Sequence, residues 1–454
     1  MKTCPFHPKP IKNKASILAT FLFKRRSWLD GLYDKSYKMK AGRVKMPGFD
    51  LHIINDTKEV RRMMVDDVDN FPKSSLLHEL LEPLLGVSVF TTNDEVWKKQ
   101  RELLAPSFEL TRVNKVFNIM NEATNELILK LNKYPNNSVI EIDEYMTFTT
   151  ADIIFRTIMS SKLDLQNGKK ILEAFNIFQD TTAKFAIGKM FFIPNWLNMM
   201  ICGNKRNKAG NTIRQILSDI IKPRYENIVN DNYNDILSTL LKTIDSKTNK
   251  RFEFDEILSQ VSMLFLAGHE TTASSLTWTL YLLSIAKNEQ EKAYKEVSEY
   301  FSTNILDINA IKKMKYLSNV FKEALRLYPP VGFFAREVRK ECKIRDKTVK
   351  AGAGVVIAPW LIHRHDDYWD NPHEFDPSRF DRVIKKDTYI PFGLGERICI
   401  GQGFATQEAI IILAHILKNY KLELENGFIP DIVGRLTIRS ANGMRIKFIR
   451  RNNE

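Results

Sequence analysis

The pattern of apolar and polar positions divides the chain into a long helical part and shorter stretches with strand character. From Leu76 to Leu217 the pattern is mostly helical, with a polar break at residues 134–138. Residues of about 40–75 are partly β, because a Pro-Gly turn at 47–48 leads into an apolar run that ends at Ile54. Residues 338–359 and 427–451 are read as strands and hairpins. The pattern predicts a mainly α protein with a smaller β region.

The breaks between these stretches are short. Polar loops occur at residues 230–234 and 245–250, and no linker rich in Pro, Gly or Ser is present. A length of 454 residues would allow up to three domains. We predict a single domain over residues 1–454, with a β-rich part at about 40–75 plus the C-terminal hairpins, and a helical core at about 76–330 and 400–420.

A long apolar helix is predicted from Asp255 to about Ala286. Its length of roughly thirty residues far exceeds the usual ~11–12, so it should cross the core. Its middle reads Ala-Gly-His-Glu-Thr-Thr over residues 267–272. Glycine in a helix interior costs up to about 1 kcal/mol, and a buried carboxylate costs more unless it is paired. Such violations are typical of functional sites, although a helix kink stabilised by Thr hydroxyls is the alternative.

A glycine-rich loop at residues 391–401 carries one thiol, Cys399, and leads into an apolar run at 404–417. A thiolate is a strong ligand for haem iron, and the nearby Arg397 would lower the pKa of the thiol. Gly395 and Gly401 would let the backbone approach a flat cofactor. The alternative is a structural cysteine in a turn before a helix.

Charge and cysteine content exclude other classes. The net charge of +14 would suit an acidic partner or nucleic acid, but no Lys/Arg run is interleaved with aromatic residues, so we expect no nucleic-acid binding. The four cysteines are far apart and form no CxxC, which excludes a zinc ribbon and a ferredoxin-type cluster and fits a reducing, cytoplasmic location. His363, His365 and His373 follow no standard zinc spacing.

Two apolar stretches raise the question of a membrane. Residues 15–23 follow several lysines, but they are too few to span a bilayer, and Lys24-Arg25-Arg26 replaces a cleavage site. We therefore expect no transmembrane anchor and a first helix there. Residues 187–202 are unusually apolar. Ordinary core, a channel lid and a weak membrane contact all remain open for this stretch.

Three motifs resemble those of the cytochrome P450 family. The Cys loop is similar to the family's haem-binding signature at Phe392, Gly395, Arg397, Cys399 and Gly401. The break in the long helix resembles the family's oxygen-binding segment, with its small residues at Ala267 and Gly268 followed by Glu270 and Thr271. Glu323, Arg326 and Arg379 resemble its buried Glu-Arg-Arg triad, although Ser378 stands where many members have Glu.

The resemblance implies the P450 fold, with haem b (iron protoporphyrin IX) between the long helix and the Cys loop. Cys399 would ligate the iron, and Ala267 and Gly268 would leave room above it. Thr271 would act on oxygen there, and Glu270 would relay protons. The haem propionates would be bound by Trp97, Arg101, Arg336 and Arg397.

The implied activity is that of a soluble, bacterial-type monooxygenase that inserts one atom of O2 into a C–H or C=C bond of a small apolar substrate. Electrons would come from a separate ferredoxin or flavodoxin with its NAD(P)H reductase. The alternatives are a non-oxygenase haem-thiolate enzyme (isomerase, dehydratase or peroxygenase) and a haem-based sensor or binding protein; the Glu270–Thr271 pair argues against the former. The expected pocket-lining residues are Val331, Phe333, Phe334, Leu436 and Thr437.

Overall fold

The computed structural model describes residues 2–8, 10, 27–46, 49–190, 193–245, 249–301 and 306–451. Its helices are α2 (Asp34–Lys38), α3 (Thr57–Arg61), α4 (Ser75–Leu85), α5 (Asp94–Leu104), α6 (Leu110–Lys115), α7 (Phe117–Leu131), α8 (Ile142–Met159), α9 (Leu165–Met190), α10 (Asn195–Asn198), α11 (Asn204–Glu226), α12 (Ile236–Lys242), α13 (Phe254–Ile285), α14 (Lys287–Tyr300), α15 (Ile308–Lys313), α16 (Lys315–Leu327), α17 (Pro359–Ile362) and α18 (Gln402–Asn419). Short 3-10 or π turns include η5 (Met199–Gly203), η7 (Pro377–Asp381) and η8 (Gly395–Arg397).

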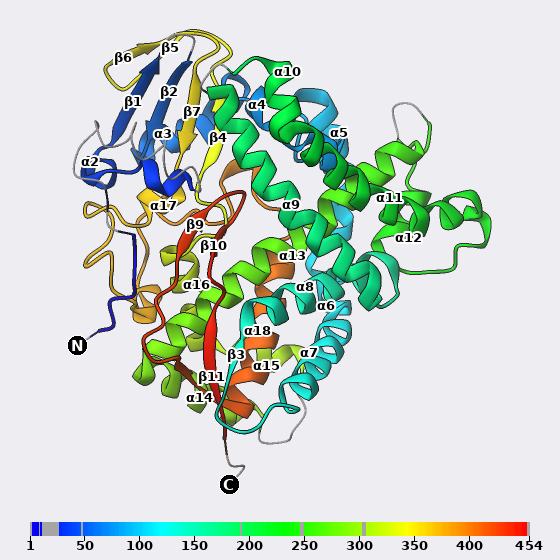
Figure 1. Ribbon diagram of the computed structural model, residues 1–454, viewed down its shortest axis with the longest axis vertical. Coiled ribbons are helices and arrows are strands. Elements are labelled where there is room, and N and C mark those ends of the chain that lie inside the picture. The colour runs from blue at the N-terminus through cyan, green and yellow to red at the C-terminus, as the bar shows by residue number, and fades with distance from the viewer. Residues whose placement is uncertain are drawn as a thin grey trace.

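The strands form small sheets at the edges of this helical body. They are β1 (Ala41–Met46), β2 (Phe49–Ile54), β3 (Ser138–Glu141), β4 (Phe334–Glu337), β5 (Cys342–Ile344), β6 (Lys347–Val349), β7 (Gly354–Ile357), β8 (Tyr420–Leu424), β9 (Ile432–Gly434), β10 (Ile438–Ser440) and β11 (Arg445–Arg450). The largest sheet has the order β1-β2-β7-β4, in which β2 and β7 are parallel, and it lies at one end of the molecule (Figure 1). The predicted mainly α fold with a smaller β region is confirmed.

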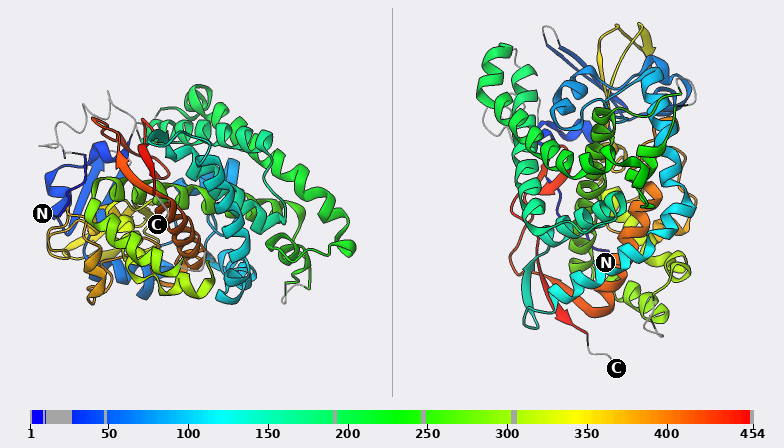
Figure 2. Two further views of the ribbon diagram at one scale, coloured as in Figure 1. Left: turned by 90° about the horizontal axis from the view of Figure 1, so that it is seen from below. Right: turned by 90° about the vertical axis from the view of Figure 1, so that its right-hand side faces the viewer.

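Helix α13 runs through the middle of the helical body (Figures 1 and 2). Most of its side chains are buried, and it packs against α8, α11, α16 and α18. It begins one residue before the predicted start because Glu253 and Glu256 form a capping box. In that box the Glu253 backbone N–H donates to the Glu256 carboxylate at 2.9 Å. The helix continues through residues 267–272 without interruption.

Three strands were not predicted from the sequence, because each is defined by pairing with a strand distant in the chain. β3 occupies the end of the predicted polar break, and β8 directly follows α18. Both pair with β11, which gives the sheet order β3-β11-β8. β4 pairs with β7 about twenty residues further along the chain. Strands of three to five residues carry too little local pattern, so their partners determine them.

The apolar stretch at residues 187–202 is only partly interior. The side chains of Trp196, Met200 and Ile201 are exposed, whereas Asn198 and Cys202 are buried between α9 and α11. Ordinary core therefore explains only part of this stretch. The predicted first helix at 15–23 lies outside the described residues. Within the part of the chain that the structure describes, no helix combines the length and apolar character needed to cross a membrane.

Candidate active site

The Cys399 loop is held in one shape by its own backbone. The Cys399 N–H donates to the Phe392 carbonyl at 2.8 Å, and the Gly393 N–H donates to the Ile390 carbonyl at 3.1 Å. Gly395 has φ +71°, and a Cβ there would lie 2.1 Å from the backbone oxygen of Met64. A side chain at Gly395 is therefore excluded by both conformation and space.

The Cys399 thiol is accessible although much of the protein surrounds it. The thiol is exposed, yet burial is the largest cause that raises its pKa. Both hold where the sulfur is accessible but protein atoms surround it closely. The Gly401 N–H and Arg101 act in the opposite direction and lower this pKa. Arg101 on α5, rather than Arg397, is the cation that lowers the pKa of this thiol.

Arg397 instead contacts Phe71 and Trp97. It donates to the Phe71 carbonyl at 3.1 Å, and its guanidinium carbon lies 5.5 Å from the centre of the buried Trp97 ring. The Lys73 ammonium lies 5.7 Å from the same ring centre. Lys73 also pairs through its backbone with Arg336 on β4. The Trp97 ring thus contacts cations from two distant segments, and a backbone bridge brings Arg336 next to one of them.

These side chains form a basic cluster, defined here as Lys73, Arg101, Arg336 and Arg397. Burial, followed by the charges of the three arginines, lowers the pKa of Lys73 to about 6. Burial and Arg397 lower the pKa of Arg336 to about 10. Within the described chain, the structure gives Lys73, Arg101 and Arg336 no carboxylate partner. Arg397 has only Glu396, at 3.7 Å.

The basic cluster is chemically suited to the carboxylates of haem. The Nε atoms of Arg336 and Arg397 are buried without a hydrogen-bond partner. Concentrated cations with unused donors are unfavourable unless an anion binds among them. Two propionates would supply that charge, so the residues present fit the group that the Cys loop implies. Sequence reasoning missed Lys73, because a single lysine after Phe71-Pro72 carries no motif.

Helix α13 carries the small residues and hydroxyls at 267–272. A Cβ on Gly268 would lie 2.7 Å from the side chain of Ile154, so Gly268 permits the close packing of α8 against α13. Ala267 is partly buried, and its carbonyl accepts a hydrogen bond from the Thr271 hydroxyl at 2.7 Å. The sequence had suggested only space for oxygen as the reason for these small residues.

Glu270 is bound within a polar network rather than free. Its carboxylate accepts hydrogen bonds from Arg439 at 2.6 Å and 3.1 Å, from Thr437 at 2.6 Å and from Gln179 at 3.1 Å. Arg439 also donates to Asp143 at 2.6 Å. Burial alone would raise the pKa of Glu270, but the Arg439 guanidinium holds it below its usual value. The network stabilises the ionised carboxylate and joins α8, α9, α13 and β10.

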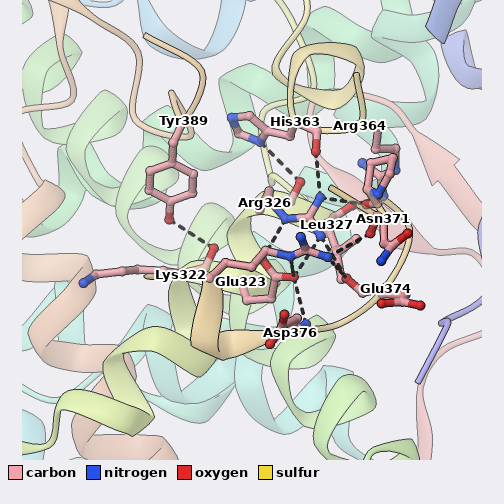
Figure 3. A network of polar contacts seen from close by, with 12 residues as sticks. Lys322, Glu323, Arg326, Leu327, His363, Arg364, Asn371, Glu374, Asp376 and Tyr389 are labelled. Carbon is pink, nitrogen blue, oxygen red and sulfur yellow. Dashed lines mark hydrogen bonds and ion pairs between the residues drawn. The ribbon is translucent and has the colours of Figure 1, made fainter. Parts of the chain in front are cut away.

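Glu323 and Arg326 lie at the centre of a polar network (Figure 3), which Arg379 also joins. Arg326 donates two hydrogen bonds to Glu323, at 2.7 Å and 2.8 Å, and both side chains have 0% exposure. Arg379 on η7 donates to the same carboxylate at 3.1 Å. Arg326 further donates to the carbonyls of His363 and Pro372, both at 2.7 Å.

His363 connects the triad to the Cys loop. Its Nδ1 lies 3.2 Å from the Arg326 carbonyl, and its Nε2 accepts a hydrogen bond from the Ile390 N–H at 2.9 Å. Ile390 in turn bonds Gly393 within the loop. Burial lowers the pKa of His363 well below its usual value, so this ring is a neutral, structural hydrogen-bonding group.

The predicted pocket residues lie in different settings. Phe333 packs edge-on against Trp28 with ring centres 5.3 Å apart. The Phe334 ring tip lies 3.8 Å from the position that a Cβ on Gly393 would take. Thr437 reaches Glu270, as described above. Leu436 is partly buried against the main core, and Val331 is half-buried.

Comparison with known sequences identifies the family to which this fold and site belong. The family model described as Cytochrome P450 matches residues 24–446. The chain therefore belongs to the cytochrome P450 family, which confirms the resemblance seen in the sequence. The crystal structure of the cytochrome P450DA heme domain matches with a TM-score of 0.81 at 22% identity, and the alignment covers 98% of both chains.

Curated relatives come from animals and plants. Cytochrome P450 4V2 of Homo sapiens is 31% identical over 403 residues, which is 83% of this chain and 76% of that protein. Echinocystic acid 23-monooxygenase of Saponaria officinalis is 30% identical over 405 residues, 83% of this chain and 77% of that protein. Other relatives are named as a hydroxylase and an oxidase. The chain is a P450 monooxygenase with a haem cofactor.

Proposed function

We propose that this enzyme binds haem b and inserts one oxygen atom of O2 into a C–H or C=C bond of a small apolar substrate. The observation that carries this proposal is the accessible Cys399 thiol, which is held in a loop fixed by its own backbone and has Arg101 of the basic cluster as a nearby cation. When bound, the haem supplies oxygen activation and the transfer of one oxygen atom. Cys399 would ligate the iron and would lose its proton on doing so.

The residues of the chain have separate roles in this proposal. The basic cluster would bind and orient the propionates, with the Trp97 ring holding two of the cations in place. Thr271 and Glu270 would hold and transfer the protons that the reaction consumes. Because Arg439 stabilises the ionised form of Glu270, proton uptake at Glu270 requires this ion pair to open.

A separate ferredoxin or flavodoxin with its NAD(P)H reductase would supply the electrons, since the P450 match itself occupies residues 24–446. The substrate would be lipid-like, and relatives named for echinocystic acid and 11-oxo-beta-amyrin support a terpenoid class. We also propose a single domain and a cytoplasmic location, which the four unpaired thiols support.

The enzyme reconstituted with a ferredoxin or flavodoxin and reductase is expected to consume O2 and NAD(P)H when a substrate is present. Candidate substrates would first be screened by the spin-state shift of the ferric haem. With isotopically labelled O2, the product is expected to contain one labelled oxygen atom, measured by mass spectrometry. A product that carries only oxygen from water would contradict the proposal, as would product formed without O2.

Replacing Arg336 with alanine is expected to weaken haem binding about 10- to 100-fold, because a hydrogen bond to a charged group contributes about 1.5–3 kcal/mol. The measurement is titration of haem-free protein with haem. Arg339→Ala is the matched control, because Arg339 lies on the same segment but is exposed and bonds Asp94 at 2.9 Å.

The stability of the haem-free variant provides a second, independent result. Arg336 is repelled by its neighbours when no carboxylate is bound, so its removal should not lower the thermal midpoint of the haem-free protein. A variant that binds haem as tightly as the Arg339→Ala control would exclude Arg336 from the propionate site.

A further inference from the structure

Glu408 is a fully buried carboxyl group without a partner. It lies on α18, nine residues after Cys399, and has 0% exposure. Neither of its oxygen atoms accepts a hydrogen bond, and no cation of the described chain forms an ion pair with it. Glu323 is equally buried, yet it is paired with Arg326 and Arg379. An ionised carboxylate in the setting of Glu408 would cost several kcal/mol.

Thr272 on α13, which packs against α18, lies close enough to Glu408 to affect its pKa. Three other hydroxyls of this helix, those of Thr271, Ser275 and Thr279, donate to the carbonyl four residues earlier at 2.7–2.8 Å. The Thr272 hydroxyl is buried and has no hydrogen-bond partner. It is thus available as an acceptor for a donor on α18.

The two groups influence each other. Burial raises the pKa of Glu408 well above its usual value, and the Thr272 hydroxyl opposes this rise. The Thr272 hydroxyl and the Glu408 carboxyl oxygens do not form a hydrogen bond with each other in this structure. A neutral carboxylic acid carries one O–H donor, and the Thr272 oxygen is an acceptor with unused capacity. Protonation of Glu408 therefore removes the buried charge and lets one hydrogen bond satisfy both side chains.

Glu408 contrasts with the acid that the sequence had singled out. Glu270 is held ionised by Arg439, whereas Glu408 faces no cation. Thr271 and Thr272 follow Glu270 directly in α13. The two hydroxyls therefore lie in the chain between the ionised Glu270 and the residue that neighbours the unpaired Glu408.

We propose that Glu408 is a neutral carboxylic acid that donates a hydrogen bond to Thr272 and thereby positions the hydroxyl pair Thr271–Thr272. Glu408 is a positioning residue that acts through Thr272, and no proton is lost from it in the reaction. The inference rests on the proposed function for its role in turnover, but the neutral state of Glu408 is a property of the resting protein and can be measured without turnover.

Infrared spectroscopy of the resting holoenzyme tests the neutral state. The spectrum of the wild type minus that of Glu408→Gln should contain one C=O band of a neutral carboxylic acid, which shifts in D2O. In Thr272→Val the band should move to higher frequency, because the hydrogen bond is lost. A difference spectrum that contains carboxylate bands instead would overturn the proposal, whether or not the enzyme proves to be a monooxygenase.

Coupling measurements test the positioning role. Glutamine can donate a hydrogen bond to Thr272 as a neutral acid does, whereas leucine fills the space without a donor. Glu408→Gln should therefore keep the wild-type ratio of product to hydrogen peroxide, and Glu408→Leu should lower it about fivefold, the size expected for one ordinary hydrogen bond. Wild-type coupling in Glu408→Leu would overturn the positioning role, and so would equal loss in both variants.

Discussion

Replacing Cys399 with serine is expected to abolish the red-shifted Soret band of the ferrous–CO form. The loop should keep its shape, because the hydrogen bond from residue 399 to the Phe392 carbonyl comes from the backbone. A serine oxygen would sit where the sulfur was, but it lacks the soft thiolate character that favours O–O cleavage. Product formation should fall by more than about 100-fold, since changes around a metal ligand alone cost about 10- to 100-fold.

The control for this variant is Cys342→Ser, which removes a partly buried thiol elsewhere in the chain. The CO spectrum and the haem content are measured in both variants. The spectrum of Cys342→Ser should equal that of the wild type. Retention of the red-shifted band in Cys399→Ser would show that another group ligates the iron, and would remove the central claim about the site.

Local motifs were sufficient to identify the parts of the site that lie close together in sequence. The signature from Phe392 to Gly401 places its glycines and its thiol within one loop, and backbone hydrogen bonds within that loop fix the geometry. Glu323 and Arg326 lie three residues apart on one helix and meet for that reason. Such pairs depend on helix and turn geometry that the sequence carries directly.

Contacts between distant segments could not be predicted. Arg439 follows Glu270 by 169 residues, and only the folded β9–β10 hairpin brings it to α13. Lys73 and Arg336 meet through a single β-bridge. Both contacts change the chemistry, because the first stabilises an ionised Glu270 and the second concentrates positive charge where the propionates would bind.

Burial was also hidden from the sequence. Glu408 stands in a helix among apolar residues, where an acid would ordinarily be read as a solvent-exposed position. Gly268 was interpreted as leaving room for oxygen, whereas the structure gives it a packing partner in Ile154. The sequence motif therefore pointed to α13, but the role of each residue in it became clear only from its neighbours in the fold.

The second large effect is expected from Glu323→Gln, which should destabilise the protein by about 3–5 kcal/mol. Removing the carboxylate charge leaves the fully buried Arg326 guanidinium without its counter-charge, and it also weakens the bond from Arg379. The remaining acceptors of Arg326 are backbone carbonyls, which carry no net charge. Chemical denaturation followed by far-UV circular dichroism measures the loss.

The same variant should also release haem more readily, because the triad is mechanically joined to the Cys loop. Arg326 bonds His363, His363 bonds Ile390, and Ile390 bonds Gly393 of the loop. Glu95→Gln is the matched control, since Glu95 forms an exposed ion pair with Lys98 at the same three-residue spacing, worth about 0–1 kcal/mol. If Glu323→Gln unfolded and lost haem at the same denaturant concentration as Glu95→Gln, the triad would not stabilise the Cys loop. We expect the Soret band of Glu323→Gln to be lost at a lower denaturant concentration than that of the control, because a shifted Ile390 would move the backbone on which Cys399 depends.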